Sequence, residues 1–205
     1  MIVDPKAISP GALYQFMISV VVPRPIAFVS TASADGRFNV APFSYFNPLT
    51  NEPPLLGISI NRRKGVLKDT LRNIEDTGEF VVNIVNEALA ERMVRTSGDW
   101  PEDVDEFQIT GLTPVPSTNV RPPRVGESPV NLECRKYQVI ELGSTYFVIG
   151  EILLAHVADD VVTNGRVDID KLRPLGRLGG DGYSVVRDVI HLPRPRVEPR
   201  AGTAG

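Results

Sequence analysis

The fold of this chain is decided by two stretches, residues 26–48, IAFVSTASADGRFNVAPFSYFNP, and residues 55–70, LLGISINRRKGVLKDT. The first stretch predicts an apolar strand over 26–31 and a return strand over 37–41. Asp35-Gly36 lies between them and supplies the backbone angles of a tight turn, so the two strands are expected to form an antiparallel hairpin. The second stretch predicts another strand, followed by a run of cations.

Short runs rich in β-branched or aromatic residues continue along the chain, each bounded by Gly, Pro, Asn or Asp. They predict further strands over 55–61, 80–85, 132–142 and 146–157. The turn Leu142-Gly143-Ser144 joins the last two of these strands as a second hairpin. The runs together indicate a barrel or a sandwich with mainly antiparallel pairing.

Three helices are predicted around these strands, over 10–19, 68–76 and 87–97. Ser9 and Asn86 are of the types that cap a helix N-terminus, and Gly78 and Gly98 are of the type that ends a helix. The helices do not alternate regularly with the strands, so a doubly wound sheet is not favoured. The predicted fold class is therefore mainly β (α+β), an antiparallel barrel with peripheral helices.

Composition limits the classes of protein to consider. With 205 residues, 42% of them hydrophobic, the chain fits one domain with a substantial core, which we place at residues 1–192. Charged residues make up 23% and the net charge is −3, so a nucleic-acid partner is not favoured. We expect a cytoplasmic protein with no membrane partner, because no targeting or spanning pattern is evident. The tail over 193–205 lacks periodicity and is expected to be disordered.

Metal chemistry has little support in the sequence. Cys134 is the only cysteine, which excludes an intrachain disulfide and a thiolate-rich zinc site. His156 and His191 are widely separated, so a metal centre would need mostly carboxylate ligands. A satisfied structural role is the commoner one for a histidine near a strand end, such as His156. We therefore expect no metal site, and no nucleophile–base pair of readable spacing emerges.

Two segments fall outside the strand and helix patterns. Residues 112–129 are rich in proline and are expected to cross the surface as a long loop, either a binding lid or a plain excursion. Residues 176–182, GRLGGDG, are glycine-rich but match neither the Rossmann fingerprint nor a P-loop. Tyr183 follows this segment and could pack on a ring, although a core or surface aromatic is the commoner case.

Polar residues near the ends of the first hairpin are candidates for binding a flat heterocycle. Thr31, Asn39 and Ser44 carry hydroxyl and amide groups that could bond ring carbonyls and nitrogens. The alternative is that they satisfy the backbone of turns, as such residues often do. Ala41-Pro42 offers a small flat surface and a free carbonyl, or simply an edge where proline is tolerated.

Cations cluster just after the strand over 55–61, namely Arg62, Arg63, Lys64 and Lys68. Such a run is most often a solvated surface. However, Asp69 and Thr70 follow at a predicted helix start, where unpaired N–H groups and the helix dipole favour an anion. The stretch therefore predicts a site for a phosphorylated ring, whether nucleotide, pyridoxal or flavin. A cofactor of this kind brings its own chemistry and needs no nucleophile–base pair.

These residues carry a resemblance to a known family. The runs PRPIAFVSTASADGRFNVAPFSYFN (23–47) and PPLLGISINRRKGVLKDTLRNIEDTGEFVVNIV (53–85) resemble the flavin reductase-like family of FMN-binding split barrels. That family includes flavoredoxins and the reductase components of two-component monooxygenases. The likeness extends through GSTYFVIGEILLAHV and PLGRLGGDGY and covers about residues 22–186.

The resemblance implies an antiparallel split β-barrel that binds FMN near the interface of a homodimer. It implies hydride transfer from NADH or NADPH to the flavin, with electrons passed on to a monooxygenase or another protein acceptor. Carried over position by position, it implies that the ring and the ribityl chain are lined by Thr31, Asn39, Ala41, Pro42 and Ser44. It implies that the ribityl end and the phosphate are held by Asn61, Arg63, Lys64, Lys68 and Thr70.

The chain departs from the family at one hairpin. Many members that use flavin as a diffusible substrate resemble one another in a Gly-Asp-His before the last strand, where this chain has Gly143-Ser144-Thr145. The missing histidine favours a protein that keeps its FMN. Two alternatives stay open, an FMN electron carrier without nicotinamide-dependent turnover of its own and a barrel that has lost its cofactor.

Overall fold

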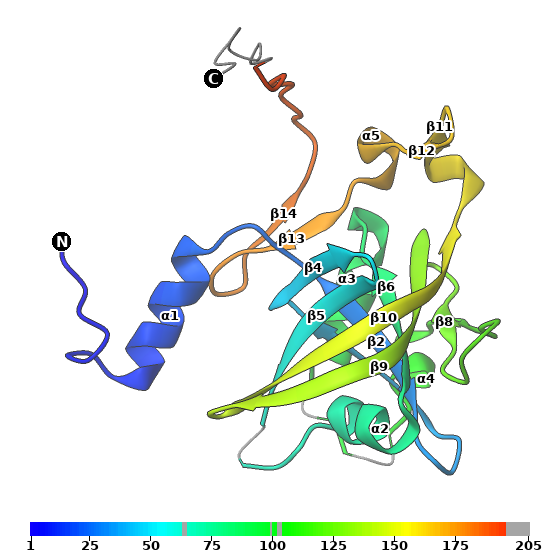
Figure 1. Ribbon diagram of the computed structural model, residues 1–205, viewed down its shortest axis with the longest axis horizontal. Coiled ribbons are helices and arrows are strands. Elements are labelled where there is room, and N and C mark those ends of the chain that lie inside the picture. Colours follow the sequence, from blue (N-terminus) through cyan, green and yellow to red (C-terminus); the bar gives the residue numbers. More distant parts are fainter. Residues whose placement is uncertain (63–64, 99, 102–103, 196–205) are drawn as a thin grey trace, which may run out of the picture.

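A seven-stranded antiparallel sheet forms the body of the protein. The computed structural model describes residues 1–62, 65–98, 100–101 and 104–195. In spatial order the strands are β3 (Phe38–Phe43), β2 (Ala27–Ala32), β6 (Glu79–Ile84), β9 (Val130–Leu142), β10 (Thr145–Val157), β5 (Pro54–Asn61) and β4 (Phe46–Asn51). The sheet curls around a common interior, and the long β9–β10 hairpin crosses it in yellow-green (Figure 1). The predicted class, a mainly β split barrel of antiparallel strands with peripheral helices, is confirmed.

The two predicted hairpins are both present. Ser30 of β2 pairs with Val40 of β3, and Thr145 of β10 pairs with Leu142 of β9. The predicted strands agree with β2, β3, β5, β6, β9 and β10 to within two residues at each end. Strand β4 was not predicted, because Pro48 and its polar neighbours do not read as a strand; proline is tolerated there since β4 lies at the edge of the sheet.

Three small ladders lie outside the main sheet. They are β1 (Arg24–Pro25) with β13 (Leu175–Arg177) and β14 (Tyr183–Val185), β7 (Pro114–Val115) with β8 (Arg124–Val125), and β11 (Val162–Thr163) with β12 (Arg166–Val167). The glycine-rich segment 176–182 is therefore part of the β13–β14 hairpin. The proline-rich segment 112–129 is a loop that contains the two-residue strands β7 and β8. Proline cannot donate a backbone N–H to a ladder, which keeps such strands short.

This proline-rich loop is fastened to the barrel at several points. The fully buried Glu133 accepts backbone N–H bonds from Thr118 at 2.7 Å and Asn119 at 2.6 Å. Val125 donates its backbone N–H to Asn83 Oδ1 at 2.9 Å. Three backbone N–H groups of the loop are thus bonded to buried side chains of the barrel. These bonds hold the loop against the barrel, so they do not support the interpretation of the loop as a binding lid.

The helices lie around the sheet. They are α1 (Pro10–Val20), α2 (Asp69–Thr77), α3 (Ala90–Thr96), α4 (Glu106–Thr110) and α5 (Ile169–Leu172), with short 3₁₀ turns η1 (Glu87–Leu89) and η2 (Asp159–Val161). The predicted caps at Ser9 and Asn86 are confirmed, since Ser9 Oγ accepts from Ala12 N and Asn86 Oδ1 accepts from Leu89 N. Gly78 ends α2 with a φ of 74°, the left-handed value that favours glycine. The short helices α4 and α5 were not predicted.

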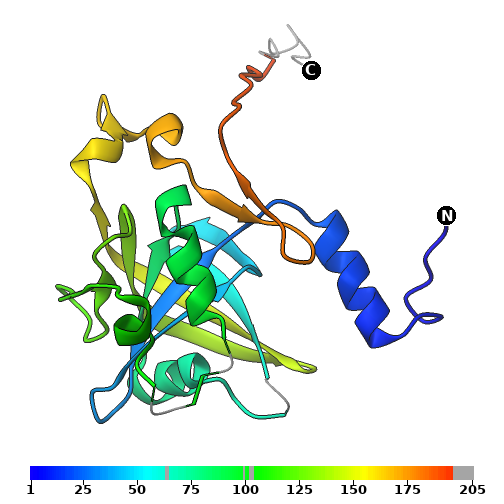
Figure 2. The same ribbon diagram turned by 180° about the vertical axis from the view of Figure 1, so that it is seen from behind.

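Helix α1 stands apart from the barrel, whereas α2, α3 and α4 lie against it (Figures 1 and 2). Ile18 is its only buried residue, and its apolar side chains Tyr14, Met17 and Val20 are exposed. The helix is attached through Arg24, which donates to the carbonyl oxygens of Ile18 at 2.8 Å and Val21 at 2.7 Å. It also meets the β13–β14 turn, where a Cβ on Gly179 would lie 3.5 Å from Ser19 Cα.

Two apolar clusters make the core. One fills the barrel interior and includes Phe80, Ile58 and Val148; the other lies under α3 and α4 and includes Phe28 and Phe107. In the first cluster Gly150 is required by close packing, because a Cβ there would lie 2.3 Å from the Phe80 ring. The second cluster supports β3 from the side where α3 and α4 pack.

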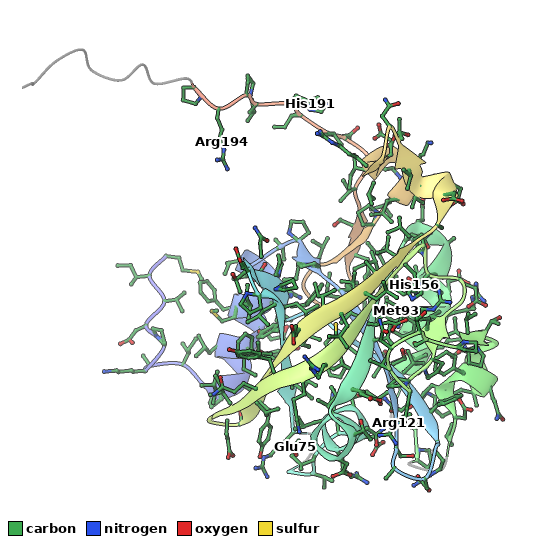
Figure 3. All side chains as sticks on the ribbon, turned by 45° about the vertical axis from the view of Figure 1, so that its right-hand side comes forward. Glu75, Met93, Arg121, His156, His191 and Arg194 are labelled. Atoms are coloured by element: carbon green, nitrogen blue, oxygen red, sulfur yellow. The ribbon has the colours of Figure 1, made fainter. Side chains whose placement is uncertain are left out.

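The C-terminal segment leaves the barrel. His191 and Arg194 lie along it, away from the body of the protein, whereas His156 lies on β10 (Figure 3). The predicted disordered tail over 193–205 lies largely outside the described residues, which end at 195. Within the described part of the chain, no helix has the length and apolar character needed to cross a bilayer.

Candidate functional site

A cleft of about 570 Å³ opens where β3 and the end of β5 meet the start of α2 and the chain after α3. Six residues that the sequence predicted for a cofactor site lie on its wall, namely Asn39, Ala41, Pro42, Asn61, Lys68 and Thr70. Strand, loop and helix start therefore converge on one hollow, as the sequence predicted for this region.

Thr31 lies behind the wall of this cleft. Its side chain is fully buried, and its Oγ1 accepts from Asn39 Nδ2 at 3.3 Å and from Asn73 Nδ2 at 2.9 Å. Asn39 also donates to Thr70 Oγ1 at 3.0 Å. These bonds join β2, β3 and α2 and fix the orientation of the Asn39 amide. Thr31 can therefore act on a ligand through Asn39, and not by direct contact in this arrangement.

The start of α2 forms the cationic end of the cleft. Lys68 is the N-cap residue, and its side chain makes no capping hydrogen bond to this helix end. An uncapped N-terminus presents backbone N–H donors and the positive end of the helix dipole. Lys68 Nζ adds a charge and lies 5.1 Å from the centroid of the Phe43 ring. This end of the cleft suits an anion such as a phosphate.

Other charges near this end are partly neutralised. Arg62 donates to Glu141 Oε1 at 3.2 Å and contacts the hydroxyl of Tyr146. Arg72 pairs with Asp69 at 2.9 Å within the first turn of α2. Arg63 and Lys64, which the sequence also predicted for a phosphate, lie outside the described residues.

Ser44 is not on the wall of the cleft. It lines two adjoining hollows instead, and its Oγ accepts from Arg24 Nε at 3.4 Å. Arg24 is buried and also donates to the carbonyl oxygen of Leu178 at 3.0 Å. Ser44 therefore lies beyond Pro42, next to the place where α1 and the β13–β14 hairpin join the barrel.

Glu106 and Trp100 are among the cleft residues that sequence reasoning missed. Glu106 is 8% exposed, and its carboxylate accepts the backbone N–H of Val40 at 3.4 Å. Burial raises the pKa of Glu106 to about 7, and the nearby carboxylates of Asp69 and Asp105 act in the same direction. Trp100 is the only tryptophan of the chain, and its indole N–H donates to the Arg95 carbonyl at 2.9 Å.

No sequence signal could have placed these two residues in the cleft. Trp100 lies between α3 and α4. Glu106 is the first residue of α4 and reaches the cleft because α4 packs on β3. A buried acid and an aromatic ring thus complete a wall whose other side is cationic and polar.

The remaining titratable candidates have structural roles. Within the described ranges, no three His, Cys, Asp or Glu side chains are grouped as metal ligands. Burial raises the pKa of the Cys134 thiol far above its usual value, so this thiol is unreactive. His156 Nε2 lies 2.6 Å from Glu133 Oε1, inside the bonds that fasten the proline-rich loop.

The protein is a split barrel with a cleft that joins a helix N-terminus to an amide-bearing strand, a lining that suits a phosphorylated ring. Residues 19–174 match the family described as "Flavin reductase like domain". The chain therefore belongs to the flavin reductase-like domain family. Membership supports a flavin cofactor and flavin-related oxidoreductase chemistry.

Three solved structures that are similar to this chain support its assignment to this family. The chain resembles nitrilotriacetate monooxygenase component B from Bacillus cereus, with a TM-score of 0.91 and 32% identity over 94% of this chain and 98% of that one. It resembles the 2-nitrobenzoate 2-nitroreductase NbaA of Pseudomonas fluorescens, with a TM-score of 0.88 and 34% identity over 98% of this chain and 100% of that one. It also resembles the flavoredoxin of Desulfovibrio vulgaris (Miyazaki F), with a TM-score of 0.77 and 26% identity over 94% of this chain and 97% of that one.

Proposed function

We propose that this protein is an FMN-dependent oxidoreductase that takes hydride from NADH or NADPH and passes electrons onward. The observation that carries the proposal is the cleft itself, in which the uncapped start of α2 and the Asn39–Pro42 part of β3 share one hollow. Its volume of about 570 Å³ has room for a tricyclic ring together with a phosphorylated side chain.

The two ends of the cleft suit the two ends of FMN. The phosphate would lie at the start of α2, held by Lys68 and by backbone N–H groups at the helix N-terminus. Asn61 lies on the wall of the same cleft. Arg63 and Lys64 stay predictions for the phosphate from the family resemblance. The ring would lie along Asn39, Ala41 and Pro42, with Thr31 orienting the Asn39 amide from behind.

Bound FMN would supply the hydride-accepting and electron-donating chemistry. The chain's own residues then have to bind, orient and polarise it. The Asn39 amide is held by Thr31 and Thr70, so it is a fixed dipole at the ring end of the cleft. Glu106 lies on the same wall, and its pKa near 7 makes it a group whose charge changes in the physiological range.

The electron acceptor is proposed to be a protein or a second small substrate. One similar structure is a monooxygenase component B and another is a nitroreductase, so both kinds of acceptor occur among related proteins. The turn Gly143-Ser144-Thr145 lacks the Gly-Asp-His of diffusible-flavin reductases, which supports a tightly held FMN. The second candidate is an FMN electron carrier, because a flavoredoxin is also among the similar structures.

We further propose that the working form is a homodimer. Helix α1 exposes Tyr14, Met17 and Val20, and Val21 and Val22 follow, all at least 41% exposed. Beside it lies a mainly apolar hollow of about 320 Å³ lined by Met17, Tyr45 and Phe46. A standing helix with an uncovered apolar face next to such a hollow is suited to packing against the same surface of a second copy.

The absorption spectrum of the purified protein, before and after anaerobic addition of NADH or NADPH, tests the proposal. We expect a flavin spectrum, or uptake of FMN that quenches Trp100 fluorescence, followed by bleaching with one of the two nicotinamides. A flavin spectrum that neither nicotinamide bleaches would favour the carrier. A colourless protein whose Trp100 fluorescence does not respond to FMN would contradict both functions and leave the barrel without a cofactor.

A further inference from the structure

The glycine-rich segment that fits no phosphate motif borders a second hollow. This hollow measures about 160 Å³ and lies between the end of β3, α3 and the β13–β14 hairpin. Its apolar floor is made by Ile26, Phe43 and Met93, all of which are buried. Its polar wall is made by Arg177, Tyr183 and the hydroxyls of Ser44 and Ser97. Of the residues that line this hollow, the proposed function uses only Pro42.

The hollow adjoins the cofactor cleft. Pro42 and Ser97 line both. Along β3 and its continuation, Asn39 and Ala41 face the cleft while Phe43 and Ser44 face the hollow. A ring stacked along Ala41 and Pro42 would therefore have one edge at the mouth of the hollow. A molecule bound in the hollow would lie beside the reacting cofactor, not at its phosphate end.

Arg177 is held by stacking on an aromatic ring, a contact that uses none of its N–H donors. Its guanidinium carbon lies 4.4 Å from the centroid of the Tyr183 ring, which is its cross-strand partner. One nitrogen donates to the Gly182 carbonyl at 3.2 Å. A guanidinium has five N–H donors in a planar fork, so stacking on the tyrosine fixes the plane of the fork and leaves an edge for a ligand.

The hollow also has an excess of positive charge. Arg177 pairs with Arg24 across β13 and β1, and like charges directly opposite each other in a ladder are unfavourable. Neither guanidinium forms an ion pair with a carboxylate anywhere in the described part of the chain. Arg24 instead bonds carbonyl oxygens and Ser44 Oγ, which lies on the wall of the hollow. An anion held there would offset this repulsion.

The size and lining of the hollow select the kind of anion. A cavity of about 150 Å³ with apolar walls accommodates a single benzene ring. Buried Ile26, Phe43 and Met93 suit the faces of such a ring, whereas the fork of Arg177 matches the two oxygens of a carboxylate. We propose that the Arg177–Tyr183 hollow is a substrate subsite for a planar, single-ring molecule that carries a carboxylate. Its place beside a flavin rests on the proposed function; the binding itself does not.

Benzoate is the probe for this subsite, with benzamide as its uncharged counterpart. Calorimetric titration of FMN-loaded and FMN-free protein should show benzoate binding in both, and at least tenfold weaker benzamide binding. Arg177→Gln should weaken benzoate by about 10- to 100-fold, the range for losing a charge-assisted hydrogen-bonded pair, and leave benzamide unchanged. Arg166→Gln is the matched control, since Arg166 is exposed on β12 and lines neither hollow.

Three results would overturn the proposal. They are an absence of benzoate binding to the wild-type protein, equal benzoate affinity in the wild type and Arg177→Gln, and a loss of FMN affinity in Arg177→Gln as large as the loss for benzoate. The last result would assign Arg177 to the cofactor. Benzoate binding to FMN-free protein that cannot take up FMN would support the subsite and contradict the proposed function, so the two failures are distinguishable. Circular dichroism of each variant shows whether the fold is kept.

Discussion

Asn39 on β3 donates from its side-chain amide to Thr70 Oγ1 in the first turn of α2, across a distance of 3.0 Å. This bond ties the strand proposed to face the ring to the helix proposed to hold the phosphate. Because Thr70 is almost fully buried, its hydroxyl serves Asn39, while its backbone N–H belongs to the helix start. The side chain and the backbone of one residue thus support opposite ends of the cleft.

Thr70→Val should weaken FMN and riboflavin by similar factors, about fivefold each. The valine keeps the shape and the backbone N–H but removes the acceptor that fixes Asn39, and one such hydrogen bond is worth about 1 kcal/mol. Quenching of Trp100 fluorescence on titration with each ligand measures the effect. Thr70→Ser, which restores the acceptor, should return both affinities toward wild type. A loss confined to FMN would instead mean that the hydroxyl serves the phosphate.

Lys68→Ala, by contrast, should weaken FMN selectively. Removing this ammonium group weakens FMN by about 1.5 to 3 kcal/mol, the range for a charge-assisted hydrogen bond, and leaves riboflavin almost unchanged because it has no phosphate. The same fluorescence titration measures both ligands. Lys6→Ala, an exposed lysine before α1, is the matched control. Equal losses for the two ligands would place the phosphate elsewhere.

The parts of this cleft that local rules determine could be predicted from the sequence. Asp35-Gly36 favours a hairpin, and the sequence predicts a helix that begins at residue 68. These two predictions place Asn39 on a hairpin strand and Thr70 near a helix start. The bond between them could not be predicted, since it depends on how α2 packs on β3. Glu106 was missed although Asp105 caps α4 and Gly111 ends it, both residue types that mark helix ends. Its contact with Val40 could not be predicted, because it depends on how α4 packs on β3.

FMN binding should weaken as the pH rises through about 7, where Glu106 ionises. The neutral form is favoured by burial, so ionisation places a new negative charge in a cleft proposed to hold a phosphate. Glu106→Gln stays neutral, and the affinity ratio of this variant to wild type should grow about three- to tenfold between pH 6 and pH 8.5, on the scale of ~1 kcal/mol for charges at a partly solvated site. The ionisation of the FMN phosphate affects both proteins equally, so it cancels in this ratio of affinities.

The same group makes a prediction about stability. Its folded pKa is raised, so Glu106 favours folding when protonated, and this contribution declines as the pH rises from its usual pKa of 4.5 to about 7. Glu106→Gln should therefore be more stable relative to wild type at pH 8 than at pH 5 in urea unfolding. A constant difference across this range would mean that Glu106 is not buried as described.

Glu133→Gln should loosen the proline-rich loop and lower the free energy of unfolding by about 1 to 3 kcal/mol, the range for leaving buried groups unsatisfied. Burial opposes ionisation of Glu133, but bonds from the Thr118 N–H, His156 and the Asn119 N–H outweigh it and hold its pKa below the usual value. A lowered pKa gives stability that is present above the usual glutamate pKa and is lost as the pH falls below it. The difference between variant and wild type should therefore shrink below pH 4.5.

Urea unfolding at pH 7 and pH 4 measures this difference, and hydrogen exchange at Thr118 and Asn119 locates it. Glu75→Gln is the control, because Glu75 is an exposed glutamate on α2, away from the loop (Figure 3). Unchanged protection of the two amides in Glu133→Gln would mean that the loop is held by its other contacts.

The uncovered face of α1 gives the last prediction. If a second copy packs there, light scattering should give a mass about twice the 22.4 kDa of the chain. Met17→Glu with Val20→Glu should shift the protein toward monomer by placing carboxylates against an apolar surface. Ile190→Glu, at an equally apolar and more exposed position on the C-terminal segment, should leave the mass unchanged. Because α1 is tied to Arg24, and Arg24 bonds Ser44 beside the cleft, loss of the dimer should also weaken FMN. A dimer that survives both glutamates would place its interface on another surface.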